Sequence, residues 1–133
     1  MEQRYRVVIA EGWDEMRECM EAAIRSSEKY ELAAMFPTAE KIREYCEEKP
    51  VDILVVEAFP RKSVDGIQVA CDIKKRRPAI RTLIITNMYD GILERRVREA
   101  GLDGLWQKDY NEHDFLQKLD ILTKGGMVYG WNA

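Results

Sequence analysis

The chain has 133 residues, of which 46% are hydrophobic and 34% charged, and its formal net charge at pH 7 is -3. This length suits a single domain with one sizeable core. The acidic balance argues against nucleic-acid binding by this chain, because contacts to phosphates need a concentrated basic surface. Three widely spaced cysteines and a single histidine indicate neither a zinc site nor a disulfide framework, which is typical of a reducing compartment.

The sequence carries no membrane or secretion signal. Residues 1–4 lead directly into the first strand pattern and contain no apolar signal segment. No apolar run approaches the length needed to span a bilayer. We therefore expect a cytoplasmic protein without a membrane partner.

Strand and helix patterns alternate five times along the chain. In chain order they predict strand 5–10, helix 14–27, strand 30–36, helix 39–48, strand 53–57, helix 67–77, strand 81–86, helix 91–100, strand 104–107 and helix 113–124. Asp14 is placed to cap the first helix, Pro78 ends the third, and Gly101 fits the C-terminal cap of the fourth. The basic run 74–77 is interpreted as a solvated helix C-terminus, where cations suit the helix dipole.

This alternation predicts an α/β fold. Short strands without strict alternation of polar and apolar residues are typical of a parallel sheet covered on both faces. Right-handed crossovers then give a doubly wound sheet of five parallel strands with five helices. A ligand site is expected beyond the C-terminal ends of the strands, where the strand order switches.

Polar residues follow four of the predicted strands at this edge. They are Glu11-Gly12, Glu57, Thr86-Asn87 and Lys108-Asp109. Two carboxylates, a hydroxyl and an ammonium in one crevice can bind a cation and contact a phosphoryl group. Any one of them alone is more simply explained as a polar strand end facing solvent, and Thr86 as a residue that caps its own backbone. Four at one sheet edge favour a site.

The segments that contain these residues are VVIAEG (7–12), VDILVVE (51–57), LIIT (83–86) and AGLDGLWQK (100–108), with Val64-Asp65-Gly66 between them. Over residues 4–124 the sequence resembles the receiver domain of two-component response regulators. The resemblance implies a flavodoxin-like receiver fold. It assigns Glu11 to the acidic pocket, Glu57 to the phosphoacceptor position, and Thr86 and Lys108 to the switch and phosphate-contact positions.

Four departures from the family pattern make this an atypical receiver. Glu57 replaces the phosphoacceptor aspartate, and Gly12 replaces the second acid, which in the family contacts magnesium directly. Pro60 lies one residue closer to the acceptor position than the family's proline, so the loop is expected to be rebuilt. Leu105 stands where many receivers carry a switching aromatic residue, with Trp106 beside it.

These departures argue against ordinary phosphorylation. The extra methylene of Glu57 moves the carboxylate by roughly 1 Å, which can cost on the order of a hundredfold in a reaction that depends on positioning. Glu57 could instead reach Lys108 directly, an ion pair that needs no metal. We therefore expect a fixed state with little or no Mg²⁺; a weak Mg²⁺ site at Glu11 and Glu57 stays open. So does the alternative, a phosphorylation-competent receiver that takes phosphate from a histidine kinase with Mg²⁺.

The expected function is a non-catalytic module in two-component signal transduction and transcription regulation. Residues 1–124 form the receiver-like domain, and 125–133 resemble the tail or linker of NarL/LuxR-type regulators that leads to an output domain absent from this chain. The expected partners are a histidine kinase or another signalling protein and a second copy in a homodimer, with DNA reached only through such an output domain. A third class, a nucleotide or flavin binder, lacks support because no glycine-rich loop follows the first strand.

The resemblance places the output face on the fourth and fifth helices and the fifth strand. Charged side chains of the fourth helix would offer contacts there or form a solvated helix face. They are Glu94, Arg95, Arg96, Arg98 and Glu99.

Overall fold

The computed structural model describes residues 3–59 and 64–130. Within these ranges five strands alternate with five helices. The strands are β1 (Tyr5–Ala10), β2 (Tyr30–Phe36), β3 (Ile53–Glu57), β4 (Arg81–Thr86) and β5 (Gly104–Gln107). The helices are α1 (Asp14–Arg25), α2 (Ile42–Glu48), α3 (Gly66–Arg76), α4 (Gly91–Glu99) and α5 (Glu112–Thr123). No helix in the described part of the chain is long and apolar enough to cross a bilayer.

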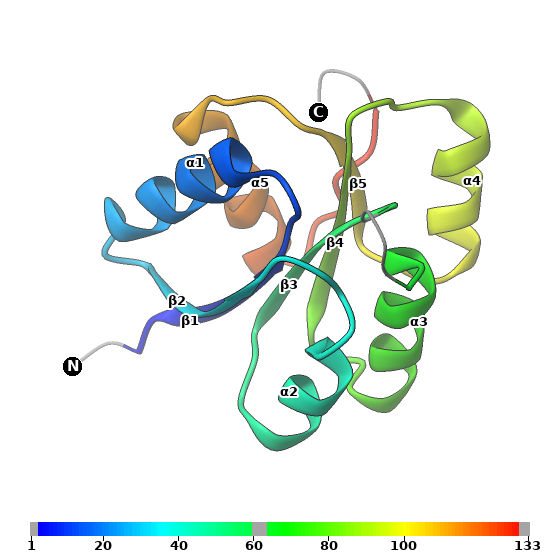
Figure 1. The fold of residues 1–133 in the computed structure, drawn as a ribbon, viewed down its shortest axis with the longest axis horizontal. Helices are drawn as coiled ribbons and strands as arrows, with labels where there is room; N and C mark the ends of the chain where they lie inside the picture. The colour runs from blue at the N-terminus through cyan, green and yellow to red at the C-terminus, as the bar shows by residue number, and fades with distance from the viewer. Residues whose placement is uncertain (1–2, 60–63, 131–133) are drawn as a thin grey trace.

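The five strands form one parallel sheet in the order β2-β1-β3-β4-β5 (Figure 1). The predicted α/β fold, a doubly wound sheet of five strands with five helices, is therefore confirmed. The strand order reverses between β1 and β3, because β2 lies on one side of β1 and the later strands lie on the other. The ends of β1 and β3 thus meet at the switch point, where a ligand site is expected.

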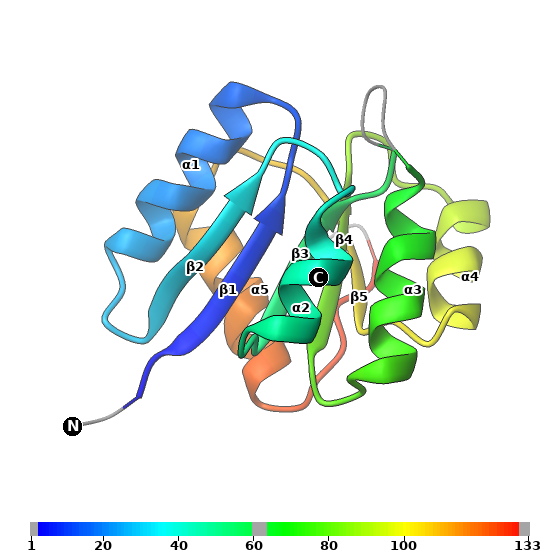
Figure 2. The same cartoon turned by 60° about the horizontal axis from the view of Figure 1, so that its bottom comes forward.

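Helices cover both faces of the sheet (Figure 2). Alternate residues of the central strands supply two hydrophobic cores, one beneath each helical layer. In β1, Val8 and Ala10 pack on the side of α2, α3 and α4, whereas Val7 and Ile9 pack on the side of α1 and α5. β3 is buried along its whole length, as expected for a central strand covered on both faces. This rigid centre fixes the position of Glu57 at its C-terminal end.

The predicted strand ranges are all confirmed, and the predicted helix ends lie within three residues of the observed ones. α2 begins at Ile42, since residues 39–41 form a turn in which the Ile42 amide bonds to the Ala39 carbonyl at 3.3 Å. The prediction that Asp14 caps α1 is wrong: Asp14 is the first helical residue and forms an ion pair with Arg17. Gly101 has φ of 76° after α4, as the predicted C-terminal cap requires.

The chain after α5 returns to the free edge of β5, and we call residues 127–130 the exit segment. Val128 forms an isolated parallel bridge with Gly104. The Leu105 amide donates to the Val128 carbonyl at 2.8 Å, and the Val128 amide donates to the Asp103 carbonyl at 3.0 Å. A Cβ on Gly104 would lie 2.7 Å from the Val128 carbonyl oxygen, so this close approach requires glycine.

Candidate functional site

The ends of three strands bring two carboxylates and one ammonium together. Glu11 follows β1, Glu57 ends β3, and Lys108 follows β5. The Lys108 Nζ lies 2.6 Å from Glu11 Oε1 and 2.9 Å from Glu57 Oε2. All three side chains are buried, with at most 8% of any of them exposed. The predicted gathering of both carboxylates and the ammonium at one sheet edge is confirmed, as is the contact between Glu57 and Lys108. The ion pair of Glu11 with the same ammonium, which completes what we call the strand-end triad, was not predicted.

Backbone amides hold the outer oxygens of both carboxylates. The Gly12 amide donates to Glu57 Oε1 at 3.1 Å, and the Trp13 amide donates to Glu11 Oε2 at 2.9 Å. Three of the four carboxylate oxygens of the triad accept a hydrogen bond, whereas the buried Glu11 Oε1 is held by its ion pair with Lys108 and accepts no hydrogen bond from the described residues. The Arg17 guanidinium fixes the same turn by donating to the Glu11 carbonyl at 2.8 Å. These contacts could not be predicted from the sequence, because every residue except proline carries a backbone donor.

Gly12 makes room for the longer side chain of Glu57. A Cβ at position 12 would lie 3.3 Å from Glu57 Oε1 and 3.6 Å from the Pro37 carbonyl oxygen. The first distance is tighter than ordinary van der Waals contact, so the glutamate carboxylate would have to shift. The two departures from the family pattern therefore adjoin each other in space and are sterically matched.

The triad carries a formal charge of -1, with two carboxylates and one ammonium in a buried position. Burial raises the pKa of Glu11 above its ordinary value, and the Lys108 ammonium and the Trp13 amide partly offset that rise. Across residues 3–59 and 64–130, no group of three or more His, Cys, Asp or Glu side chains is placed to hold a metal ion.

Thr86 ends β4 beside the triad, but its hydroxyl bonds locally. The Thr86 Oγ1 accepts from the Met88 amide and donates to the Met88 carbonyl, both at 3.2 Å. The simpler interpretation, a threonine that caps its own backbone, is thus confirmed. Thr86 and Glu57 also line one small cavity of about 230 Å³, together with Asn87, Phe59 and Met88. Asp109 lies apart, accepting from the Asn111 amide at 3.0 Å.

The loop after β3 is described only in part. The predicted rearrangement at Pro60 lies outside the described residues. Asp65 caps α3 by accepting from the amides of Ile67 and Gln68. A Cβ on Gly66 would lie 2.1 Å from the Glu57 carbonyl oxygen, so the first residue of α3 packs directly on the strand end.

The two residues at the family's switching position lie inside the protein. Leu105 is fully buried in the core beneath α3 and α4. Trp106 is 4% exposed and stacks on Phe115 of α5, with ring centroids 6.0 Å apart. Trp106 is therefore a core residue, whereas Trp13 beside Glu11 is 39% exposed.

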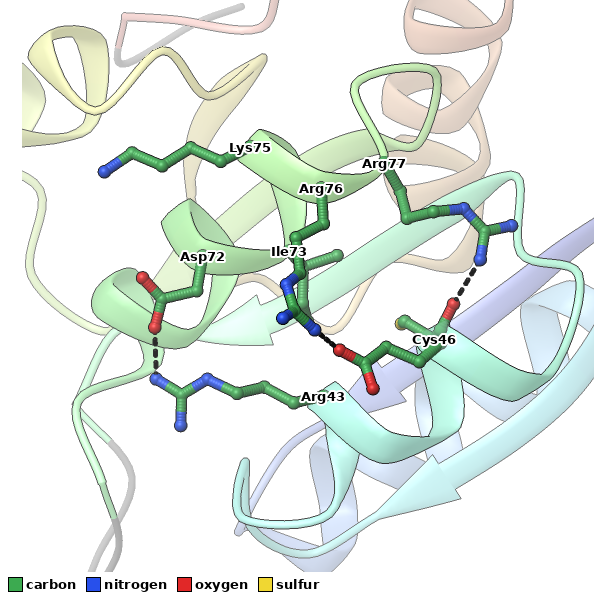
Figure 3. Close-up of a pocket in the computed structure, with 8 residues that line it drawn as sticks. Arg43, Cys46, Asp72, Ile73, Lys75, Arg76 and Arg77 are labelled. Atoms are coloured by element: carbon green, nitrogen blue, oxygen red, sulfur yellow. Dashed lines mark hydrogen bonds and ion pairs between the residues drawn. The ribbon is translucent and has the colours of Figure 1, made fainter.

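A separate hollow of about 470 Å³ lies between α2 and α3, away from the strand ends (Figure 3). Two ion pairs cross it in opposite directions, Arg43 of α2 with Asp72 of α3 and Arg76 of α3 with Glu47 of α2. Arg77 adds a hydrogen bond to the Cys46 carbonyl at 2.7 Å. The basic end of α3 was predicted to be a solvated helix C-terminus. Instead, Arg76 and Arg77 make contacts that join α3 to α2.

The family model for the response regulator receiver domain matches residues 7–120 of the chain. The chain belongs to this family. No curated protein matches it. Receiver domains are signalling domains of two-component systems, and the strand-end triad of this receiver lies at the edge of the sheet where the resemblance places the phosphorylation site.

Solved response regulators share the fold of this receiver. The non-phosphorylated receiver domain of the stress response regulator RcsB from Escherichia coli superposes with a TM-score of 0.85 at 17% identity, covering 96% of this chain and 99% of that one. The signal receiver domain of the putative response regulator NarL from Mycobacterium tuberculosis gives 0.85 at 18% identity, covering 93% and 99%. A Salmonella typhimurium RcsB structure gives 0.84 at 17% identity, and this receiver spans 63% of its length.

Proposed function

We propose that this receiver domain acts as a non-catalytic signalling module in a state held by its own strand-end triad, without ordinary aspartyl phosphorylation. The observation that carries the proposal is the position of the Lys108 ammonium, 2.6 Å from Glu11 and 2.9 Å from Glu57. The outer oxygen of each carboxylate is held by a backbone amide and the inner oxygen of each pairs with Lys108, so both carboxylates are engaged by groups of the chain itself. The state is transmitted by contacts with other proteins.

The donors at the strand ends do not fit a magnesium ion. Mg²⁺ requires near-octahedral coordination by oxygen atoms, usually with carboxylates that are free to bind it. Here Lys108 engages one oxygen of each carboxylate, and Gly12 contributes no third carboxylate. Mg²⁺ would have to displace the ammonium from both partners, so any binding would be weak.

Phosphoryl transfer to Glu57 would meet the same obstacle. The Glu57 oxygens are held by the Gly12 amide at 3.1 Å and the Lys108 ammonium at 2.9 Å. A phosphoryl group would bring further negative charge to a buried centre that is already at -1, where Lys108 is the one cation that residues 3–59 and 64–130 pair with both carboxylates. The competing function, a receiver that accepts phosphate from a histidine kinase with Mg²⁺, requires this arrangement to open.

The proposed setting is a cytoplasmic two-component pathway. The partners would be a histidine kinase or another signalling protein, and a second copy of the chain in a homodimer. The Salmonella typhimurium RcsB structure is described in terms of DNA interaction. For this chain, DNA contact and transcription regulation would come only through an output domain joined to the receiver (1–124) by the tail (125–133).

The test combines a small phosphodonor, acetyl phosphate, with Mg²⁺ and intact-mass measurement. Wild-type protein is expected to acquire no stable phosphoryl group, because Lys108 pairs with both carboxylates, including that of Glu57 at the acceptor position. The Gly12→Asp/Glu57→Asp variant restores the family's acidic set and is expected to become labelled in a Mg²⁺-dependent way. Glu57→Asp alone is the matched control for the acceptor. Stable phosphate on the wild-type protein would refute the proposal and favour the competing function.

A Mg²⁺ titration followed by tryptophan fluorescence gives a second readout. The Trp13 amide binds Glu11, and the Trp13 side chain is partly exposed, so its emission should respond to ion binding at the triad. We expect a flat titration for the wild type and a saturable change for Gly12→Asp/Glu57→Asp. A saturable change in the wild type would contradict the claim that Lys108 excludes the ion.

A further inference from the structure

Three contacts dock the exit segment against the body of the domain. Val128 bridges to the edge of β5. The Tyr129 hydroxyl donates to the Leu102 carbonyl at 2.8 Å. The Gly130 amide donates to the Tyr89 hydroxyl at 2.7 Å. The last of these joins the segment to the loop that follows β4, which is the loop that begins at Thr86.

Tyr89 is held on both sides. Its amide donates to Gln107 Oε1 at 3.0 Å, at the end of β5. Its hydroxyl accepts from Gly130 and donates to the Glu94 carboxylate. Only 4% of the residue is exposed, so the position of this ring and hydroxyl is set by packing. Tyr89 therefore bridges the strand ends and the exit segment.

Backbone contacts connect Lys108 of the strand-end triad to the turn that contains Tyr89. The Lys108 amide donates to the Thr86 carbonyl at 2.8 Å, and Gln107, the partner of the Tyr89 amide, is the residue before Lys108. The Thr86 hydroxyl holds Met88 at 3.2 Å, which fixes the turn that leads to Tyr89. A displacement of Lys108 or of Thr86 would thus move the backbone that positions Tyr89.

Two charged residues of α4 also contact the exit segment or its partner Tyr89. We call the contacts of the exit segment with β5, Leu102, Tyr89 and Arg98 the clasp. The Arg98 guanidinium carbon lies 3.8 Å from the centroid of the Tyr129 ring, and Arg98 pairs with Glu94 at 2.9 Å. Glu94 in turn accepts from the Tyr89 hydroxyl. Glu94 and Arg98, which the sequence assigned to outward charged contacts or a solvated helix face, are therefore engaged within the chain.

We propose that Tyr89 is the positioning residue through which the strand-end centre controls docking of the exit segment. Leu105, at the family's switching position, is buried and apolar and has no hydroxyl with which to make such a contact. The exit segment is docked when the Thr86–Tyr89 turn has the observed conformation. In this proposal, a movement of the turn displaces the Tyr89 hydroxyl and releases the segment. This regulation rests on the proposed function, since Lys108 of the triad also donates its backbone amide to the Thr86 carbonyl at the start of the turn.

The test is amide hydrogen exchange in the full chain. Tyr89→Phe keeps the ring and removes the hydroxyl that Gly130 binds. Loss of one net hydrogen bond is expected to speed exchange of the Gly130, Val128 and Leu105 amides by about two- to tenfold. Tyr110→Phe, at an exposed tyrosine, is the matched control and should leave them unchanged. Unchanged exchange of the exit segment in Tyr89→Phe would overturn the proposal.

A second pair of variants tests the coupling. Thr86→Val keeps the branched shape and removes the hydroxyl, and it should speed exchange of the same three amides. Added to Tyr89→Phe, it should have no further effect, because both act through one contact. An unaffected exit segment in Thr86→Val, or fully additive effects in the double variant, would overturn the coupling. Gln107→Met removes the acceptor for the Tyr89 amide and should reproduce the result if Tyr89→Phe fails to fold.

The phosphodonor assay on wild-type protein is independent of these exchange measurements. Faster exchange in Tyr89→Phe together with stable phosphate on the wild type would support the clasp while refuting the proposed fixed state. Unchanged exchange with no phosphate would refute the clasp and leave the fixed state supported.

Discussion

The Lys108 ammonium neutralises part of the negative charge of the buried Glu11 and Glu57 carboxylates. The ammonium is 2% exposed and contacts Glu11 and Glu57, whose own exposure is similarly low. Without it, two carboxylates would share a buried site with only the amides of Gly12 and Trp13 as partners. An uncompensated buried charge is among the most costly defects in a folded protein.

We expect Lys108→Met to lower the free energy of unfolding by about 3–5 kcal/mol, because it leaves both carboxylates without a cation. Urea unfolding followed by circular dichroism measures the change. Lys41→Met, at an exposed lysine, is the matched control and should be nearly neutral. Replacing Glu11 and Glu57 by glutamine in the Lys108→Met background should restore most of the loss. A loss no larger than that of the control would show that Lys108 does not balance the triad.

At the residue scale the sequence predicted that Glu11, Glu57 and Lys108 gather at one sheet edge and that Glu57 reaches Lys108, but not the Glu11–Lys108 ion pair or the two amide contacts. The Glu57–Lys108 pair follows from charge and position at neighbouring strand ends. The placement of Glu11 on the same ammonium depends on how far apart β1 and β5 end, which a sequence pattern does not encode. The Gly12 and Trp13 amides were missed because every residue except proline carries such a donor.

The helices differ in how their N-termini are capped. α3, α4 and α5 begin after Asp65, Asp90 and Asn111, whose side chains accept from amides of the first turn. α1 begins after Trp13 without a side-chain cap. The prediction of Asp14 as the cap failed because Asp14 is itself the first residue of the helix and its carboxylate pairs with Arg17.

The junction of β3 and α3 predicts a contrast between two glycines. Gly66→Ala should destabilise the protein by about 1–3 kcal/mol or more, because its Cβ would meet the Glu57 carbonyl oxygen at 2.1 Å and overpack the strand end. Gly91→Ala, also at the first position of a helix, meets nothing within 4 Å and should be neutral or stabilise by up to about 1 kcal/mol. Thermal and urea unfolding of both variants check this. Equal effects would contradict the close packing of α3 on β3.

For the whole molecule, the pattern of short apolar strands and amphipathic helices predicted the parallel sheet and the helices on both of its faces. It also predicted that polar side chains gather at the C-terminal ends of the strands, where the triad lies. The exit segment escaped prediction: residues 125–133 carry no periodicity and are interpreted from the sequence as a tail or linker, whereas residues 127–130 pack against the edge of the sheet. Their structure comes from tertiary contacts, chiefly the bridge of Val128 to β5 and the burial of Tyr129. Contacts of this kind form only when the sheet edge already exists.

Tyr129 makes docking of the exit segment sensitive to alkaline pH. Burial raises the pKa of Tyr129 from its ordinary value of 10.0 to about 12. The unfolded chain therefore loses the phenol proton first, and the stability contributed by Tyr129 is complete below about pH 10 and is lost as pH rises towards about 12. In urea unfolding, the advantage of wild type over Tyr129→Phe should shrink between about pH 9 and about pH 11. A difference that does not vary with pH would contradict the burial of this phenol.

Closure of the β5 edge by Val128 also bears on synthesis of the chain. A polypeptide leaving the ribosome presents β5 before the residues that cover it, and α5 must emerge in between. Until then the Leu105 amide and the Asp103 carbonyl lack their partners from Val128. An uncovered strand edge can pair with other chains, so the nascent domain is most prone to aggregation in this interval. Residues that emerge after α5 thus protect the edge of the finished sheet.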